Sequence, residues 1–476
     1  MFAKIQHIHF VGIGGIGMSG IAEVLLNLGY KVSGSDLKSS PVTHRLEQLG
    51  ARVVLGHHAE NIAGAEVVVA SAAIPSDNPE VVAAAALHTP VIQRAEMLAE
   101  LMRLKYGIAV AGMHGKTTTT SMVAAVLGAG GLDPTVVVGG RVDALGSNAR
   151  LGKSQYLVAE ADESDRSFLK LSPVLAVVTN IDREHMDCYR NMRDVKSAFL
   201  EFMDHVPFYG MVVACNDDPI LRKLLPQVRR RTKTYGRRRG SDFQVKILQT
   251  AGAESREEQG FQGCNSFSVV YGTQKLGKFR LKVPGHHNIL NATAAIAVGI
   301  GLEIPVDQIR LALENFSGVD RRFQLRGRVA GISVIDDYGH HPTEIRATLA
   351  AARQCGYKKV HVIFQPHRYT RTKLLLNDFA TAFSEADSVA ILDIYGANEP
   401  PIDGVTGEEL ARHIPCPGGQ SATYAASFAD AVQIAVAEAR PGDMVLTLGA
   451  GNISQLAPMI VAALQPAEAN AAAVTS

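Results

Sequence analysis

The feature that most constrains this chain is the stretch Val110-Ala-Gly-Met-His-Gly-Lys-Thr-Thr-Thr-Thr120. An apolar run from Tyr106 to Ala111 leads into it, and Ser121 to Leu127 reads as a buried helix. A strand, a glycine turn and a helix that opens on Lys-Thr form the arrangement of a phosphate-binding loop. The backbone N–H groups of Gly112 to Thr117 would attract anions, because the helix dipole is positive at that end.

Two side chains of this loop carry the predicted chemistry. Lys116 supplies a mobile positive charge, and the Thr117 hydroxyl can reach a Mg²⁺ ion held between phosphates. The loop is shorter than usual, since Ala109 stands where the standard pattern has another glycine. The alternative is a glycine turn that serves only as a tight connection.

Length and charge exclude several classes of protein. At 476 residues the chain needs two or three domains. Its 47 basic and 46 acidic residues nearly cancel, which argues against a nucleic-acid binder, and we interpret the two Arg-Arg-Arg runs as solvated loops. The sequence has no run of about 18 apolar residues, so no membrane-spanning helix is predicted. Without a signal-peptide pattern, and with five scattered cysteines, a reduced, cytoplasmic protein is expected.

The first 36 residues carry the fingerprint of a dinucleotide-binding unit. A strand over residues 5–11 is followed by the turn Gly12-Ile-Gly-Gly-Ile-Gly17, a helix over 18–28, and a strand that ends at Asp36. We therefore expect a diphosphate against Gly14, Gly15 and Gly17, although the nucleotide is not identified. A packing-only glycine turn is the alternative. Ser71, after a strand over 66–70, lies at the same predicted ligand edge, and a helix over 94–104 leads out of the domain.

Acidic and histidine side chains follow two later strands. The strand Tyr156–Glu160 runs into Glu160-Ala-Asp-Glu-Ser-Asp165, and four acids in six residues would repel one another without a cation. Glu160 is the best ligand candidate, with a solvated acidic turn as the alternative. His185 follows a strand over 174–180, and convergence with the phosphate loop favours a metal or phosphate role.

The remaining chain first shows the alternating pattern of antiparallel strands and then returns to alternating strands and helices. Alternating stretches between Phe243 and Val283 predict a small antiparallel sheet. Asn288 and Asn291 open the next helix, as caps or as contacts to a nucleotide. After an arginine-bearing hinge over 318–323, strands over 331–335 and 359–364 end in Asp336-Asp-Tyr-Gly-His-His-Pro342 and Gln365-Pro-His-Arg-Tyr-Thr-Arg371. These polar clusters again lie at the carboxyl ends of strands, where ligands bind.

Seven motifs in this order resemble one family. They are Gly12-Ile-Gly-Gly-Ile-Gly-Met18, Gly112-x-His-Gly-Lys-Thr117, Glu160-Ala-Asp-Glu-Ser-Asp165, Thr179-Asn-Ile-x-x-x-His-Met-Asp187, Gly285-x-His-Asn288, Asp336-Asp-Tyr-Gly-His-His-Pro342 and Gln365-Pro-His-Arg-Tyr-x-Arg371. Over residues 5–455 the chain resembles the Mur ligases, in the branch that adds L-alanine. The resemblance implies an α/β fold of three domains. These are a Rossmann-like domain (1–104) for the UDP-sugar, a central P-loop ATPase-type sheet with a small antiparallel sheet (105–322) for ATP, and a Rossmann-like domain (323–476) for the amino acid.

The resemblance also implies a reaction. The carboxylate of UDP-N-acetylmuramate attacks the γ-phosphate of ATP, and L-alanine captures the acyl phosphate, in peptidoglycan precursor synthesis. Implied catalytic residues are Lys116, His185 and Arg322, and implied Mg²⁺ ligands are Thr117, Glu160 and His185. Implied ATP contacts are Gly112, Met113, His114, Gly115, Lys116, Thr117, Thr118, Asn288, Asn291, Arg322 and Asp337. Implied UDP-sugar contacts are Gly14, Gly15, Gly17, Met18, Ser19, Asp36 and Ser71, and implied amino-acid contacts are Tyr338, His340, His367, Arg368 and Arg371. A monomer or homodimer is expected.

Two positions depart from the wider family, and three other functions compete. Met113 stands where the family usually has threonine, and Leu200 stands where other Mur ligases carry a carbamylated lysine, which fits the L-alanine branch. The first alternative is a ligase that attaches a preformed murein peptide to the same sugar nucleotide. The others are an NAD-dependent oxidoreductase and a nucleotide-sensing protein without catalysis.

Overall fold

The computed structural model describes residues 5–71, 74–142, 147–249, 265–416 and 421–465. The chain divides into two compact units. The first contains Met1–Lys246, Phe267–Phe279 and Leu290–Val319, and the second contains Ile247–Ser266, Arg280–Ile289 and Asp320–Ser476. The sheets are described below in chain order.

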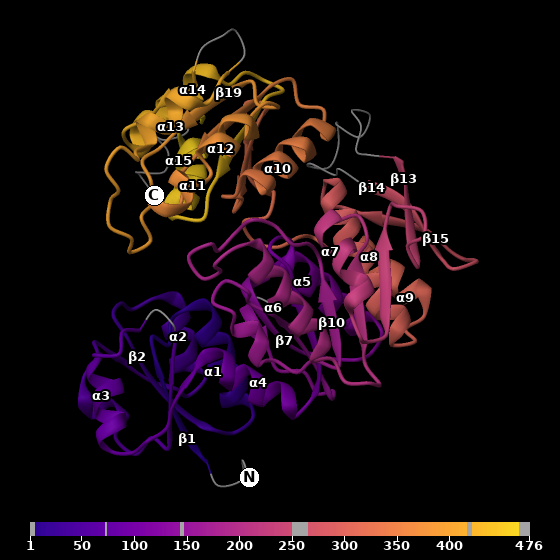
Figure 1. Cartoon of the computed structure of the whole chain (residues 1–476). Coiled ribbons are helices and arrows are strands. Elements are labelled where there is room, and N and C mark those ends of the chain that lie inside the picture. The colour runs from indigo at the N-terminus through magenta and orange to yellow at the C-terminus, as the bar shows by residue number, and fades with distance from the viewer. Residues whose placement is uncertain (1–4, 72–73, 143–146, 250–264, 417–420, 466–476) are drawn as a thin grey trace, which may run out of the picture. The chain divides into compact units, whose positions relative to one another are not determined.

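The N-terminal part of the first unit is a five-stranded sheet in the order β3-β2-β1-β4-β5 (Figure 1). Its four pairs of neighbouring strands are all parallel. Every residue of the central strand β1 is buried, as expected for a strand covered on both faces. The elements are β1 (His7–Val11), α1 (Ile16–Asn27), β2 (Lys31–Asp36), α2 (Pro41–Gln48), β3 (Arg52–Leu55), β4 (Val67–Ala70), α3 (Pro79–Ala86), β5 (Val91–Gln93) and α4 (Arg94–Arg103).

A ten-stranded sheet follows, in the order β15-β14-β13-β12-β11-β10-β6-β9-β7-β8. Strand β6 pairs in parallel with β10 on one side and β9 on the other, and the predicted strands over 243–283 extend the opposite edge as β13 to β15. Its strands are β6 (Tyr106–Ala111), β7 (Thr135–Val142), β8 (Ser147–Arg150), β9 (Tyr156–Glu160), β10 (Leu175–Val178), β11 (Met211–Cys215), β12 (Thr232–Gly236), β13 (Phe243–Gln249), β14 (Asn265–Tyr271) and β15 (Gln274–Leu281). Its helices are α5 (Lys116–Ala129), α6 (Met192–Asp204), α7 (Pro219–Leu224), α8 (His286–Gly301) and α9 (Val306–Glu314).

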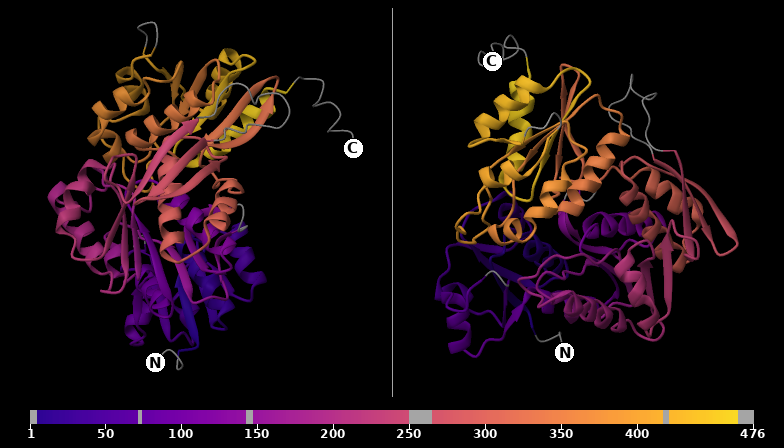
Figure 2. Two further views of the ribbon diagram at one scale, coloured as in Figure 1. Left: turned by 90° about the vertical axis from the view of Figure 1, so that its right-hand side faces the viewer. Right: turned by 45° about the horizontal axis from the view of Figure 1, so that its top comes forward.

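The second unit carries a six-stranded sheet in the order β16-β17-β21-β18-β19-β20, with helices on both faces (Figure 2). Two apolar clusters, one on each face, bury β17, β18, β19 and β21. The strands are β16 (Gln324–Val329), β17 (Ile332–Asp337), β18 (Val360–Phe364), β19 (Ser388–Ile391), β20 (Thr423–Tyr424) and β21 (Met444–Leu448). The helices are α10 (Pro342–Gln354), α11 (Tyr369–Leu374), α12 (Leu376–Ala382), α13 (Gly407–His413), α14 (Phe428–Glu438) and α15 (Leu456–Ala463).

The structure adds elements that the sequence pattern did not predict. Strand β16 pairs antiparallel with β17, and its mixed burial hides the alternation that a sequence search looks for. Helix α8 begins at His286, so the two candidate asparagines lie in its first two turns. Among the described residues, no helix is both long enough and apolar enough to cross a membrane.

Candidate active site

The phosphate loop lies where three strand ends meet. Strand β6 ends at Ala111, and its register places Val110 beside Glu160 of β9 and Ala111 beside Val178 of β10. The phosphate loop, the acidic turn and the segment that carries His185 therefore leave the sheet side by side, because parallel neighbours end at one edge. The convergence predicted from the sequence is present in the first unit.

Two glycines give the loop its shape. Gly112 has a φ of +133° and Gly115 a φ of +82°, conformations that side chains rarely adopt. A Cβ on Gly115 would lie 2.9 Å from Oδ1 of Asn291, so α8 brings this asparagine against the loop as the sequence suggested. Gly115 is the N-cap of α5 and offers no side-chain cap, which leaves the first turn of the helix open to an anion.

The end of β10 fixes the loop from the other side. Asn180 accepts a hydrogen bond from the N–H of His114 (2.9 Å) through Oδ1 and donates one to its carbonyl (2.9 Å) through Nδ2. The Asn180 carbonyl also accepts the N–H of Met113 at 3.3 Å, and the Thr179 hydroxyl donates to the His114 carbonyl at 2.7 Å. In the sequence, Thr179 and Asn180 stand out only as the first two residues of the motif that ends at Asp187.

These contacts change the expected set of phosphate donors. We predicted that all N–H groups from Gly112 to Thr117 face the ligand, but those of Met113 and His114 are occupied by Asn180. The donors left for a phosphate lie at the start of α5, which is where the dipole acts most strongly. Met113 itself is only 5% exposed, so its side chain packs inside the protein. Having methionine here in place of the family's usual threonine therefore leaves the backbone N–H donors of the loop unchanged.

Lys116 is the charged centre of the loop. Its ammonium donates to the carbonyls of Gly112 (2.8 Å) and Met113 (3.2 Å) and to Oε1 of Glu163 at 2.7 Å. Burial lowers the pKa of Lys116, but the Glu163 and Asp162 carboxylates outweigh burial and raise the pKa above its ordinary value. Lys116 is therefore a fixed positive charge.

The acidic turn supplies two carboxylates in different environments. Glu160 ends β9 and is half-buried, whereas Glu163 is completely buried and lies on Lys116. His185 has a φ of +56°, and its Nε2 lies 3.6 Å from Oε1 of Glu163 and 3.9 Å from Oε1 of Glu184. Backbone strain of this kind gathers at functional sites, which fits the predicted role of His185. Our sequence reasoning favoured Glu160 and missed Glu163, because only burial distinguishes the acids of this turn.

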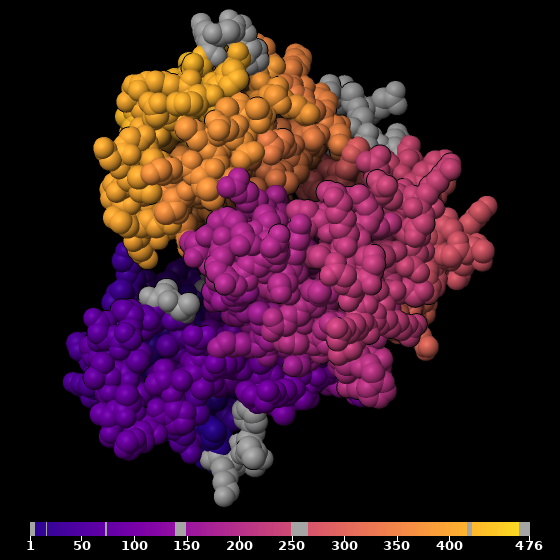
Figure 3. All heavy atoms as spheres, viewed as in Figure 1, coloured from indigo at the N-terminus to yellow at the C-terminus, as the bar shows by residue number. Residues whose placement is uncertain are grey.

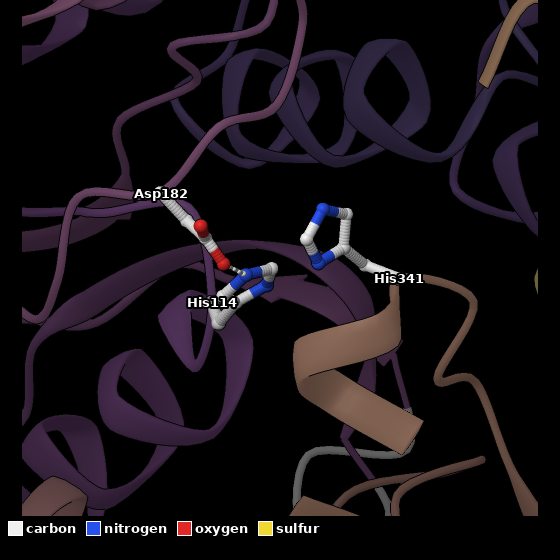
Figure 4. A group of neighbouring side chains, drawn as sticks. All are labelled: His114, Asp182 and His341. Carbon is white, nitrogen blue, oxygen red and sulfur yellow. Dashed lines mark hydrogen bonds and ion pairs between the residues drawn. The ribbon is translucent and has the colours of Figure 1, made fainter. Parts of the chain in front are cut away.

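The other loop residues have separate partners. The imidazole of His114 donates from Nε2 to Oδ2 of Asp182 at 3.0 Å (Figure 4). The side chains of Thr117 and Thr118 are largely buried at the start of α5, and the Thr117 carbonyl accepts the Ser121 hydroxyl. Asp182 holds the His114 ring beside the loop, so it belongs to the site although no sequence motif singled it out.

The glycine turn of the N-terminal sheet is also tied to its predicted acid. The N–H of Gly14 donates to Oδ2 of Asp36 at 2.8 Å, so the carboxylate fixes the backbone of the glycine turn. Gly15 is exposed, whereas Met18 and Ser19 are each 2% exposed and lie in the buried face of α1. Ser71 follows β4 at the same edge, and the next two residues, Ala72 and Ala73, lie outside the described residues.

Two charge pairs connect the start of α4 to the acidic turn and to the segment that follows it, within the first unit. Arg94, the first residue of α4, approaches Gly17, whose added Cβ would lie 3.0 Å from its Cδ, and its Nη2 reaches Asp162 at 3.3 Å. Lys170 donates to Gln93 at 2.8 Å and pairs with Glu96. The start of α4 therefore touches both the glycine turn and the acidic turn.

In the second unit, arginines and aromatic rings meet beyond β17. The Arg321 and Arg322 guanidinium carbons lie 5.1 and 5.0 Å from the ring centre of Tyr338. Arg321 is bound to Asp336 (3.1 Å) and to the Gly449 carbonyl (2.6 Å), which makes it part of the scaffold. Arg322 lies 3.8 Å from Glu344 and remains partly exposed. Of the two hinge arginines, the implied catalytic one is thus the more accessible.

Asp337 and Asn288 are held by the protein itself. Asp337 accepts the N–H groups of Phe323 (2.7 Å) and Gly339 (2.8 Å), and burial raises its pKa against the opposing charge of Arg322. Asn288 donates to the Pro284 carbonyl at 2.6 Å. Both were expected to touch the nucleotide, and in this structure their described bonds stabilise local turns.

Residues predicted to contact the amino acid lie close to one another beyond β17 and β18. The ring of His367 lies 5.6 Å from that of His340 and stacks on Tyr395 at 5.7 Å, while its Nδ1 lies 3.1 Å from Nη1 of Arg371. Arg368 has a φ of +70° and a ψ of 135°, a strained conformation for a residue with a side chain. His341, also drawn in Figure 4, caps α10. Tyr395 was not predicted, because it follows a short strand without a motif.

Fold and site together define an α/β protein with a phosphate-loop type of turn at a sheet edge, and three family models give its class. Residues 7–106 match the Mur ligase family, catalytic domain; residues 110–299 match the Mur ligase middle domain; and residues 321–451 match the Mur ligase, glutamate ligase domain. The three segments can be followed by colour along the chain, from indigo to yellow, in the space-filling view (Figure 3). The chain belongs to the Mur ligase family, and the predicted family and three-domain α/β fold are confirmed.

Individual relatives are more specific. The chain is 68% identical to a UDP-N-acetylmuramate–L-alanine ligase from Koribacter versatilis over 462 residues, which are 97% of this chain and 98% of the relative. It is 63% identical to the protein of the same name from Acidobacterium capsulatum over 465 residues, 98% of this chain and 99% of that one. A solved UDP-N-acetylmuramate-alanine ligase from Thermotoga maritima matches with a TM-score of 0.80 at 30% identity, covering 96% of this chain and 99% of the other.

Proposed function

We propose that this chain is an ATP-dependent ligase that joins L-alanine to the carboxylate of UDP-N-acetylmuramate in peptidoglycan precursor synthesis. The observation that carries the proposal is the 68% identity with an enzyme of that name over almost the whole of both chains. The site agrees with it, since a phosphate loop, an acidic turn and a strained histidine meet at one sheet edge.

The reaction has two steps, a phosphoryl transfer and the formation of an amide bond. A carboxylate oxygen of the sugar nucleotide attacks the γ-phosphorus of ATP, the bond to the β-phosphate oxygen breaks, and ADP leaves. The amine of L-alanine then attacks the acyl carbon, loses a proton and expels inorganic phosphate. Both partners of the first step are anions, so charge neutralisation and in-line positioning matter more than covalent help from the protein.

Lys116 and the open first turn of α5 are the residues we assign to the β- and γ-phosphates. Lys116 already carries its charge inside the loop, and Gly115 leaves backbone donors uncapped above it. Asn291 borders the same loop. The predicted contacts of the sugar nucleotide at Gly14, Gly15 and Gly17 remain part of the proposal. So do Arg322 on the phosphates and Arg371 on the alanine carboxylate.

A divalent cation fits the side chains of this edge. Thr117 and Glu160 would hold one Mg²⁺ through hydroxyl and carboxylate oxygens. His185 would hold a second one through its imidazole. The buried Oε2 of Glu163 has no hydrogen-bond partner among the described residues, which marks a place for further positive charge. When bound, the ion would neutralise charge that develops on the transferring phosphoryl group.

The competing function is a ligase that attaches a murein peptide to the same sugar nucleotide. A murein peptide ligase from Psychrobacter arcticus has the same fold, with a TM-score of 0.69 at 24% identity over 96% of this chain and 98% of that one. Purified protein with ATP, Mg²⁺ and UDP-N-acetylmuramate should release phosphate when L-alanine is added. Release with the tripeptide L-alanyl-γ-D-glutamyl-meso-diaminopimelate but not with L-alanine would replace our proposal with this one.

A further inference from the structure

Glu163 is a buried carboxylate in which only one of the two oxygens accepts a hydrogen bond within the described residues. Its side chain is 1% exposed, and Oε1 accepts Lys116 at 2.7 Å. Oε2 is also buried, but it has no hydrogen-bond partner in the described parts of the chain. An unsatisfied buried carboxylate oxygen is costly, so its persistence calls for a reason beyond packing.

Lys116 is fully committed in this state of the loop. An ammonium group has three donors, and three acceptors surround it: two loop carbonyls and Glu163. A nucleotide phosphate can bind Lys116 only if at least one of these bonds is given up. Glu163 is the only one of the three that competes with the phosphate by charge.

The backbone of Glu163 is anchored independently of its side chain. The Tyr189 hydroxyl donates to the Glu163 carbonyl at 2.7 Å, and the N–H of Arg166 donates to the same oxygen at 3.1 Å. The acidic turn therefore keeps its position without the carboxylate. The side chain is free to serve Lys116, and a purely structural role for it is not needed.

From this geometry we infer that Glu163 is a positioning residue that makes nucleotide binding dependent on a divalent cation. Its carboxylate holds the Lys116 ammonium at the loop. When Lys116 turns to the phosphates, the Glu163 carboxylate loses its ion pair with Lys116 and stays buried next to a polyanion. Binding is then favourable only if positive charge enters beside Glu163, where His185 already lies 3.6 Å from Oε1. This inference rests on the proposed function, because it assumes that the loop binds ATP.

The test compares ADP binding in EDTA and in Mg²⁺ by calorimetry. For wild type we expect Mg²⁺ to tighten binding strongly. Glu163→Gln keeps the shape of the side chain and an acceptor for Lys116 but removes the charge. In EDTA this variant should bind ADP about tenfold tighter than wild type, and its gain from Mg²⁺ should shrink accordingly, the effect expected for one charged contact.

Two further variants separate charge from shape. Asp165→Asn removes an acid of the same turn that bonds the Ser167 N–H at 2.9 Å, and it should keep the wild-type ratio between the two conditions. Glu163→Asp keeps the charge on a shorter arm and should keep weak binding in EDTA. If Glu163→Gln did not fold, Glu163→Asp would still test the idea, since tight metal-free binding by that variant contradicts it.

The inference is overturned if Glu163→Gln binds ADP in EDTA no tighter than wild type, or if both conditions weaken by the same factor. Failure of the proposed function would look different. It would appear as a lack of alanine-dependent phosphate release by the wild-type protein, whatever the ADP affinities of the variants.

Discussion

A Cβ atom on Gly112 would lie 2.0 Å from Oγ1 of Thr179, closer than any two such atoms approach in a protein. Gly112 also has a φ of +133°. The phosphate loop can therefore lie against the end of β10 only because this position has no side chain. We expect Gly112→Ala to lose ATP binding and to lower the melting temperature, as calorimetry and thermal unfolding can measure.

The matched control for Gly112 is Gly131, which has a φ of +75° and no atom within 4 Å of an added Cβ. Gly131→Ala should cost only the backbone term, about 1 kcal/mol of unfolding free energy, and should keep normal ATP binding. Equal effects of the two variants would show that the contact with Thr179 does not matter.

Asn180 should be needed for a preformed loop. Its side chain makes two hydrogen bonds to His114, each worth about 0.5–1.5 kcal/mol. Asn180→Ala is expected to raise the Kd for ATP about five- to thirtyfold with the protein still folded. Asn216 follows β11 on the same sheet and bonds Ser241 at 3.0 Å away from the loop, so Asn216→Ala should leave the Kd unchanged. A normal Kd in Asn180→Ala would contradict our account of the loop.

Lys116→Ala should affect both turnover and stability. We expect phosphate release to fall by at least about a thousandfold, as for a lost charge clamp on the transferring group. The melting temperature should also fall, because the buried Glu163 loses its ion-pair partner. Adding Glu163→Gln should restore most of the stability and none of the turnover. Near-normal phosphate release by Lys116→Ala would remove the loop from the active site.

Acid should weaken the anchor between the acidic turn and α6. The Arg166 guanidinium bonds Asp194 at 2.9 Å, and together with Arg190 it lowers the pKa of Asp194 from 3.8 to about 2. Because the folded pKa is the lower one, the stabilisation is complete above about pH 4 and disappears as the pH falls toward 2. Asp194→Asn should therefore be less stable than wild type at pH 7, and the difference should shrink through that window.

Urea unfolding at a series of pH values measures this difference. Asp307→Asn is the control. Asp307 lies on α9, its side chain is 90% exposed, and within the described residues its ion pair is with Arg310. It should show little difference from wild type at any pH. A constant deficit of Asp194→Asn down to pH 2 would mean that the carboxylate charge is not what stabilises the turn.

Much of the fold could be predicted from the sequence, because apolar runs and glycine turns act locally. The strand Tyr156–Glu160 was predicted with the bounds that the structure gives. The domain boundaries at residues 104 and 322 stay predictions. Strand β16 was missed, because its half-buried residues show no clear alternation and only pairing with β17 makes it a strand.

The site was predicted less completely, for a physical reason. The sequence by itself determined which residues can bind phosphate or metal, since Gly112, Lys116 and Glu160 follow strands in a pattern that few other functions need. Only the tertiary structure decided which partners they meet. The order β10-β6-β9 places Asn180 on the loop and Glu163 on Lys116. Strand order, and the burial that follows from it, depends on contacts between residues far apart in the chain, and no local pattern records them.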